Sequence, residues 1–184
     1  MSGERQVKVL YDADVIAKRV EELARDIAAL KPKDLLVAAI LKGSFMFAAD
    51  LLRALHRVGL EPHVEFFHLS SYREGTVSSG AVTILRDIES TVRDRDVLLI
   101  DDILESGRTL AFAKDLLIAR GARKVMICTM LEKPGKRAVQ ISADFVGFVC
   151  PDVFVVGYGM DVAHSYRELP FIGRVVIGDE AETA

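Results

Sequence analysis

Apolar positions in the first part of the chain follow two different periods. Between residues 15 and 30 they recur every three or four positions, which predicts a helix with one buried face that ends before Pro32. Residues 35–41 are all apolar and predict a buried strand, with Lys42 and Gly43 in the turn that follows. A second helix is predicted from Ser44, which can cap its first turn, to Gly59, which can end it.

The rest of the chain repeats this alternation of strands and helices. Further strands are predicted at residues 63–69, 81–85, 97–100, 124–131, 145–149 and 154–157. Residues 109–119 predict a helix that ends at Gly121, whereas residues 70–80 have no apolar period and predict a long polar loop of the kind that often binds ligands. Alternating strands and helices indicate an α/β fold, with a mostly parallel sheet covered by helices on both faces.

Composition adds that the chain is a globular protein. With 51% hydrophobic and 28% charged residues among 184, the chain is too apolar for disorder and suits one domain. The longest apolar run, residues 35–41, is far shorter than the ~20 residues that span a membrane, and no signal peptide is expected at the N-terminus. Cys128 and Cys150 stand in apolar surroundings without metal-binding spacing, which predicts buried thiols and a cytoplasmic protein.

The charge balance of the chain argues against nucleic acids as partners. The 24 basic and 27 acidic residues give a net charge of -3. Proteins that bind nucleic acid along a whole face need a basic surplus, although a local basic patch would be compatible with this balance. We therefore expect no nucleic-acid partner, and the short apolar runs give no reason to expect a membrane.

Residues 97–110 carry the most informative chemistry. A buried strand is followed by Asp101 and Asp102, at the carboxyl end where open α/β sheets bind ligands. The turn after them contains Ser106, Gly107 and Thr109 and opens a helix. Free backbone N–H groups and the positive end of the helix dipole suit a phosphate there. The segment predicts a sugar-phosphate pocket, and its spacing differs from that of a Walker A loop.

Residues 100–109 resemble the phosphoribosyl-pyrophosphate (PRPP) signature of type I phosphoribosyltransferases. Four further segments, residues 41–44, 70–72, 131–134 and 145–161, resemble motifs of hypoxanthine–guanine phosphoribosyltransferases in the same order. Five motifs in order over nearly the whole chain are highly specific. The resemblance implies a type I phosphoribosyltransferase core in a single domain, residues 1–184, with a small hood formed mainly by residues 145–184.

The activity that this resemblance implies is purine salvage. The 5-phosphoribosyl group of PRPP would pass to hypoxanthine or guanine, with Mg²⁺, giving IMP or GMP and pyrophosphate. The family also implies a homo-oligomer, a dimer or a tetramer. Two alternatives stay open: a xanthine-preferring phosphoribosyltransferase, and a non-catalytic regulator that senses PRPP or nucleotides on the same fold.

The resemblance also assigns residues to PRPP and its metal. Asp101 and Asp102 would face the ribose hydroxyls and Mg²⁺, because carboxylate oxygens suit a hard cation. Asp161 resembles a ligand to the Mg²⁺ on the pyrophosphate; the alternative is an acid in a simple turn. The residues assigned to PRPP itself are Lys42, Gly43, Asp101, Asp102, Glu105, Ser106, Gly107, Arg108, Thr109 and Arg167. In the family, the loop that matches Lys42 and Gly43 contains a cis peptide bond that does not involve proline.

The purine would be bound by a second group of residues. Lys133 resembles the residue that donates to the 6-oxo group, which favours oxopurines over adenine and does not exclude xanthine. Phe154 would stack on the ring and Val155 would contact its edge through the main chain. Ser71 and Tyr72 would belong to a lid over the site. Without the resemblance, these would be a solvated basic loop, a core aromatic residue and a polar loop.

Glu105 departs from the family pattern, which usually has Asp at this position followed by Thr. The carboxylate at this position is the proposed acceptor of the proton on purine N7. Glutamate retains the carboxylate on an arm longer by one methylene, and Ser106 retains the hydroxyl. We therefore expect Glu105 to act as the general base; the alternative is a charge that only favours the helix N-terminus.

Overall fold

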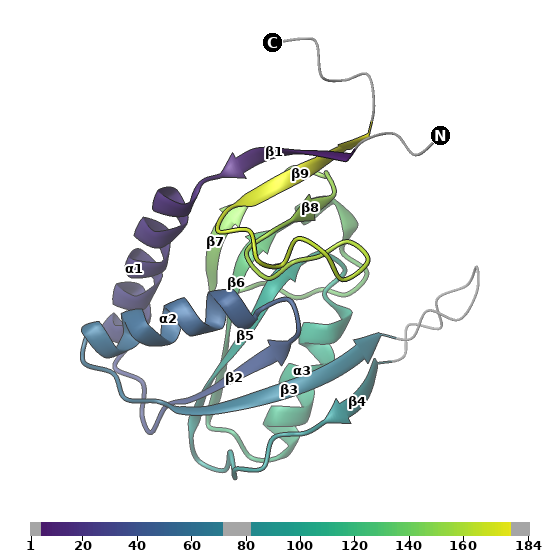
Figure 1. The fold of residues 1–184 in the computed structure, drawn as a ribbon. Helices are drawn as coiled ribbons and strands as arrows, with labels where there is room; N and C mark the ends of the chain where they lie inside the picture. The colour runs from purple at the N-terminus through teal and green to yellow at the C-terminus, as the bar shows by residue number, and fades with distance from the viewer. Residues whose placement is uncertain (1–4, 72–81, 178–184) are drawn as a thin grey trace.

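The computed structural model describes residues 5–71 and 82–177. These residues form two sheets, three α-helices and one short 3-10 helix (Figure 1). In chain order the elements are β1 (Arg5–Tyr11), α1 (Ala13–Ala29), β2 (Leu36–Leu41), α2 (Phe45–Arg57), β3 (His63–Ser71), β4 (Val82–Arg86), β5 (Asp96–Leu104), α3 (Arg108–Ala119), β6 (Lys124–Glu132), η1 (Pro134–Lys136), β7 (Phe145–Val149), β8 (Val155–Val156) and β9 (Ile172–Ile177).

The larger sheet has six strands in the order β4-β3-β2-β5-β6-β7. All of its neighbouring strands are parallel except β4, which pairs antiparallel with β3 at one edge. The predicted α/β fold with a mostly parallel sheet is therefore confirmed. The fully apolar sequence of β2 follows from its central place, because a strand covered on both faces has no solvent side.

Helices cover both faces of this sheet. The α1 and α2 helices lie together on one face, and α3 lies on the other (Figure 1). Alternate residues of β2 are buried on opposite faces of the sheet. Val37 and Ala39 join the core under α1 and α2, whereas Leu36 and Ala38 join the core under α3. The α1 helix begins at its Asp12 cap, whose carboxylate accepts the backbone N–H of Val15 at 2.9 Å.

The smaller sheet joins the two ends of the described chain. Its order is β1-β9-β8, all antiparallel, and it lies at one end of the larger sheet (Figure 1). The sequence patterns did not predict β1, and β7 belongs to the larger sheet. Val155 and Ile172 of the smaller sheet are buried in the same core as α1 and α2, so the two sheets pack on each other.

Three boundaries differ from the sequence prediction. The β5 strand continues to Leu104, because its backbone stays paired with β6 up to Glu132, and so both acids lie inside a strand rather than in a turn. Ser44 precedes α2 without capping it; its hydroxyl instead donates to the carbonyl of Ile40 at 2.5 Å. Residues 70 and 71 belong to β3, and the rest of the predicted polar loop lies outside the described residues.

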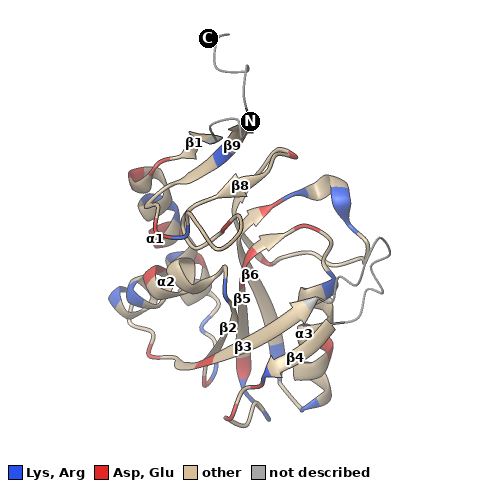
Figure 2. Ribbon diagram, turned by 45° about the vertical axis from the view of Figure 1, so that its right-hand side comes forward, with Lys and Arg blue, Asp and Glu red and all other residues tan. Residues whose placement is uncertain are grey.

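Acidic and basic residues are interspersed over the described elements (Figure 2). A basic stretch stands out between β6 and β7, where Lys133, Lys136 and Arg137 lie within five positions. No described helix has the length and apolar character that a membrane span requires.

Candidate functional site

Two cavities meet at the carboxyl end of β5. The Asp101 cavity, of about 290 Å³, is lined by Ile40, Leu41, Gly43, Leu69, Asp101, Asp102, Ile103, Leu104, Glu105, Ser106, Gly107, Thr109 and Leu110. The Lys133 cavity, of about 350 Å³, is lined by Asp102, Ile103, Glu105, Lys133, Lys136, Asp152, Val153, Phe154, Val155, Met160 and Asp161. Asp102, Ile103 and Glu105 line both. A reaction between two bound molecules would take place at this shared wall.

The acid pair stands in the wall of the Asp101 cavity. Asp101 is 8% exposed, and its Oδ1 accepts the backbone N–H of Asp102 at 3.0 Å. Neither carboxylate forms an ion pair with a basic side chain of the described chain. Burial, reinforced by the charge of Asp102, raises the pKa of Asp101 well above its ordinary value. Burial also raises the pKa of Asp102, which hydrogen bonds to its carboxylate, including that from the Ile103 N–H, and then the Arg167 charge partly oppose. A cation or ligand hydroxyl groups beside these two carboxylates would stabilise their ionised forms.

The turn after β5 is the segment that the sequence predicts to hold a phosphate. Gly107 adopts a φ of 80° at the start of α3, and a Cβ atom there would lie 2.5 Å from the Ile141 side chain, so only glycine fits. Gly107 has no side chain to cap α3, and the Arg108 N–H donates to the Ser106 hydroxyl at 3.4 Å, whereas the N–H groups of Thr109 and Leu110 have no hydrogen-bond partner in the described part of the chain. Ser106 and Thr109 line the same cavity. Ser106, Gly107 and Thr109 thus lie together at the cavity and Arg108 lies outside its lining, while phosphate binding by this turn stays a prediction.

Gly43 allows its backbone to lie against β5 at the acid pair, and Gly159 allows a third segment to lie against Gly43. The peptide bond between Leu41 and Lys42 is cis. A Cβ atom on Gly43 would lie 1.7 Å from Oδ2 of Asp102, and one on Gly159, whose φ is 98°, would lie 2.2 Å from the Gly43 carbonyl oxygen. The backbone at Gly43 therefore lies directly against the carboxylate, whereas the exposed Lys42 side chain lines neither cavity.

Asp161 and Arg167 pair with each other beside the cavities. Arg167 Nη2 lies 2.7 Å from Asp161 Oδ1, and its Nη1 donates to the Gly159 carbonyl at 2.6 Å. The other Asp161 oxygen accepts the backbone N–H of His164 at 2.7 Å. Asp161 lines the Lys133 cavity, but Arg167 lines neither.

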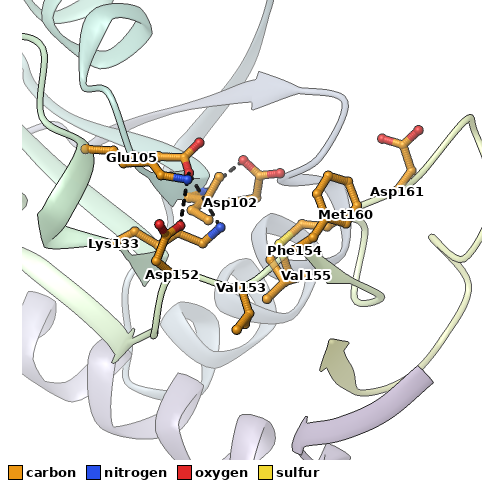
Figure 3. Close-up of a pocket in the computed structure, with 11 residues that line it drawn as sticks. Asp102, Glu105, Lys133, Asp152, Val153, Phe154, Val155, Met160 and Asp161 are labelled. Carbon is orange, nitrogen blue, oxygen red and sulfur yellow. Dashed lines mark hydrogen bonds and ion pairs between the residues drawn. The ribbon is translucent and has the colours of Figure 1, made fainter. Parts of the chain in front are cut away.

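The polar end of the Lys133 cavity is a chain of alternating charges. Lys133 is only 7% exposed, and its Nζ lies 3.5 Å from Glu105 Oε1. Lys136 Nζ lies 3.7 Å from the same oxygen and 2.7 Å from Asp152 Oδ1. This hydrogen bond with Asp152 raises the pKa of Lys136. Figure 3 shows the Glu105, Lys133 and Asp152 side chains together at this end.

The opposite end of the Lys133 cavity is apolar. Phe154 is 58% exposed at the cavity, while Val155 and Met160 are buried beneath it (Figure 3). An exposed aromatic face opposite a charged wall suits a flat ring that carries polar atoms along one edge. Phe154 is therefore no core residue, and its stacking on a purine stays a prediction.

The structure adds residues that the sequence patterns missed. Lys136, Asp152, Val153 and Met160 line the Lys133 cavity, and Arg137 lies behind it. Lys136 and Arg137 belong to the basic stretch after β6, and Asp152, Val153 and Met160 lie inside the 145–161 motif, but no pattern singled them out. Of the two lid candidates, Ser71 is the last residue of β3, and Tyr72 lies outside the described residues.

Comparisons with known proteins agree on one family. The model of the phosphoribosyl transferase domain matches residues 6–163. A hypoxanthine phosphoribosyltransferase of Escherichia coli is 41% identical over 177 residues, which cover 95% of this chain and 98% of that protein. A bifunctional protein TilS/HprT of Listeria innocua is 46% identical over 167 residues, and the chain spans 25% of its length.

Solved structures share the fold at similar identity. A crystal structure of a hypoxanthine phosphoribosyltransferase from Staphylococcus aureus has a TM-score of 0.86 and 39% identity, covering 92% of this chain and 91% of that one. A hypoxanthine-guanine phosphoribosyltransferase from Bacillus anthracis, with a HEPES molecule in its active site, also has a TM-score of 0.86 and 39% identity, covering 93% and 100%.

Proposed function

Because this chain belongs to the phosphoribosyltransferase family, we propose that it transfers the 5-phosphoribosyl group of PRPP to hypoxanthine or guanine and releases pyrophosphate. One observation carries the choice of acceptor: the ammonium of Lys133 and the carboxylate of Glu105 lie 3.5 Å apart on the wall that faces the acid pair. The 6-oxo group and N7 are neighbours on one edge of a purine. Lys133 could therefore donate to the 6-oxo group while Glu105 accepts the proton from N7.

The Asp101 cavity supplies the features that PRPP requires. The backbone and hydroxyls of residues 105–109 would hold the 5′-phosphate, and Asp101 and Asp102 would face the ribose hydroxyls. The backbone at Lys42 and Gly43, with Arg167, would bind the pyrophosphate, since a guanidinium suits phosphate oxygens. Arg167 would have to share its charge between Asp161 and this ligand.

The residues present fit a Mg²⁺ ion that arrives with PRPP. Asp101 is a buried acid without a basic partner in the described chain, and added positive charge would stabilise its ionised form. No group of three or more potential ligands is found among the described residues. Mg²⁺ usually binds one or two carboxylates and completes its shell with substrate phosphates and water. We propose Asp101 and Asp102 as ligands to Mg²⁺ at the ribose hydroxyls and Asp161 as a ligand to Mg²⁺ on the pyrophosphate, whose charge the ion would neutralise.

The reaction would then proceed at the wall shared by the two cavities. Departure of pyrophosphate leaves positive charge on the ribose, which the carboxylates of Asp101 and Asp102 stabilise. N9 of the purine bonds to the anomeric carbon as the bond to pyrophosphate breaks, and Glu105 accepts the proton from N7, so that the five-membered ring of the product carries no positive charge. The purine replaces the contact that Glu105 and Lys133 make with each other, so both groups are already oriented toward its edge.

Two broader properties also remain proposals. We propose a homo-oligomer of two or four copies, as the family resemblance implies. We propose a cytoplasmic location, which agrees with the free, buried thiols of Cys128 and Cys150.

The test is a comparison of turnover with hypoxanthine, guanine, xanthine and adenine at fixed PRPP and Mg²⁺. We expect pyrophosphate release with hypoxanthine or guanine and little with adenine. Preference for xanthine would support the alternative phosphoribosyltransferase. No purine-dependent release, with retained PRPP or nucleotide binding, would support a regulator instead. Lys133→Met should lower kcat/KM for the purine more than it lowers affinity for PRPP, because Lys133 lines only one cavity.

A further inference from the structure

Arg137 lies outside the lining of both cavities, yet its guanidinium contacts the backbone that carries them. Its Nη1 lies 2.8 Å from the carbonyl oxygen of Leu104, 2.6 Å from that of Glu105 and 3.2 Å from that of Lys133. Its Nη2 donates to the carboxylate of Glu132. One side chain therefore connects two segments almost thirty residues apart, both of which carry a proposed active-site residue.

The contact to Glu105 has no substitute. Other bonds hold the same two segments together: the backbone N–H of Lys133 donates to Leu104 at 3.0 Å, and that of Ala138 donates to Ser106 at 2.9 Å. In the described part of the chain, the Glu105 carbonyl receives a hydrogen bond from Arg137 alone. Leu104 and Ser106 are thus fixed by the backbone, and the residue between them is fixed by a guanidinium.

Burial and charge make this contact strong. The Arg137 and Glu132 side chains are only 20% and 24% exposed, so water competes weakly for their hydrogen bonds. Hydrogen bonds from a charged donor are stronger than neutral ones, and the rigid planar fork of arginine holds several acceptors in one geometry. A lysine could keep the charge but not the fork.

We infer that Arg137 is a positioning residue that sets the 3.5 Å spacing between the Glu105 carboxylate and the Lys133 ammonium, and thereby fixes recognition of the purine edge. This inference rests on the proposed function, because the spacing matters only if both groups meet one base. Arg137 would act on the purine without touching it. Binding of PRPP would depend on it much less, because the backbone N–H groups of Ala138 and Val139 hold the 105–109 turn at Ser106 without Arg137.

The experiment compares Arg137→Met and Arg137→Lys with wild type in the full chain. Steady-state kinetics give kcat and KM separately for hypoxanthine and PRPP, and thermal unfolding is measured alongside. Arg120→Lys is the matched control, because Arg120 also forms a forked pair, with Asp87, but at the far end of α3. We expect Arg137→Met to lower kcat/KM for hypoxanthine at least tenfold, a loss of about 1.4 kcal/mol. Its KM for PRPP should stay within about twofold of wild type, a difference well below that tenfold step.

Combined variants distinguish positioning from a general loss of stability. If Arg137 acts through the Lys133 and Glu105 pair, then Arg137→Lys should add little to the kinetic defect of Lys133→Met. The inference would be overturned if the losses in kcat/KM of the two substitutions were fully additive. Equal losses in kcat/KM for hypoxanthine and for PRPP would also overturn it, and so would a wild-type kcat/KM in either Arg137 variant. If Arg137→Met does not fold, Arg137→Lys alone decides between these outcomes. A wild-type chain that releases no pyrophosphate with any purine would instead refute the proposed function.

Discussion

Replacing Glu105 by glutamine tests the chemistry most directly. The amide has the size of the carboxylate and can still accept a hydrogen bond from Lys133, but it cannot take a proton. If Glu105 removes the N7 proton, turnover should fall by about 10²–10⁴-fold, the usual contribution of a general base. Binding of PRPP should change little, since the turn that holds its 5′-phosphate uses backbone N–H groups and hydroxyls.

The structure predicts that stability will hardly change. The Glu105 side chain is 38% exposed, and its ion pairs with Lys133 and Lys136 span 3.5 and 3.7 Å. The exposed pair with Lys136 contributes about 0.2–1 kcal/mol. Lys133 is almost buried, but the amide oxygen of the Glu105→Gln variant can still accept a hydrogen bond from it. For a chain of this length, 1 kcal/mol shifts the melting temperature by about 2–4 °C. The expected loss of turnover therefore cannot result from unfolding at assay temperatures.

Single-turnover measurements provide the assay, because they report chemistry even when product release limits the steady state. Asp152→Asn is the matched control: it makes the same change of carboxylate to amide, on the other partner of Lys136. We expect it to leave single-turnover rates within about threefold, less than the effect assigned to a general base. If Glu105→Gln also stays within that range, Glu105 is not the base, and its charge only favours the start of α3.

Three further predictions concern backbone fit, buried charge and thiols. Gly43→Ala should lower kcat/KM for PRPP at least tenfold, about 1.4 kcal/mol, because its Cβ would collide with the Asp102 carboxylate; thermal unfolding would show whether the fold survives. Asp101→Asn should abolish most turnover yet raise the melting temperature at pH 7. Burial raises the pKa of Asp101, so the folded state binds this proton more tightly than the unfolded state, and the wild type loses stability as pH rises. Below about pH 4 Asp101 is protonated in both states, so the higher melting temperature of Asp101→Asn should vanish there. Melting curves at both pH values test this. Burial likewise raises the pKa of the Cys128 and Cys150 thiols, so a disulfide reagent at pH 7.5 should modify them only after denaturation.

The sequence predicts the central sheet well because its strands are covered on both faces. Continuous apolar runs marked β2, β5 and β6, and glycines marked the ends of the helices between them. The end of β5 was missed because aspartates are poor strand formers, whereas the backbone at Asp101 and Asp102 continues to pair with β6 regardless of their side chains. Tertiary pairing decided that boundary.

The smaller sheet illustrates a different limit. Arg5, Gln6 and Lys8 interrupt the apolar residues of β1, and the strand forms by pairing with β9, which lies more than 160 positions away. No local pattern contains that pairing. Register between distant strands requires three-dimensional information.

The candidate site divides in the same way. Asp101, Gly107 and Thr109 were predicted because local spacing and family resemblance both mark them. Arg137 was missed because its partners are backbone carbonyls, which leave no trace in residue identity. Lys136 and Asp152 meet only because η1 and the segment before β8 fold toward each other.

The order of segments along the chain has a consequence for synthesis on the ribosome. All residues that line the Asp101 cavity lie before residue 111, whereas six of the eleven that line the Lys133 cavity follow residue 151. The β8 strand that carries Val155 pairs with β9, and β9 pairs in turn with β1, the first strand to be made. The emerging chain must therefore keep β1 unpaired until its last strand leaves the ribosome, and the purine half of the site is completed only when the two ends meet.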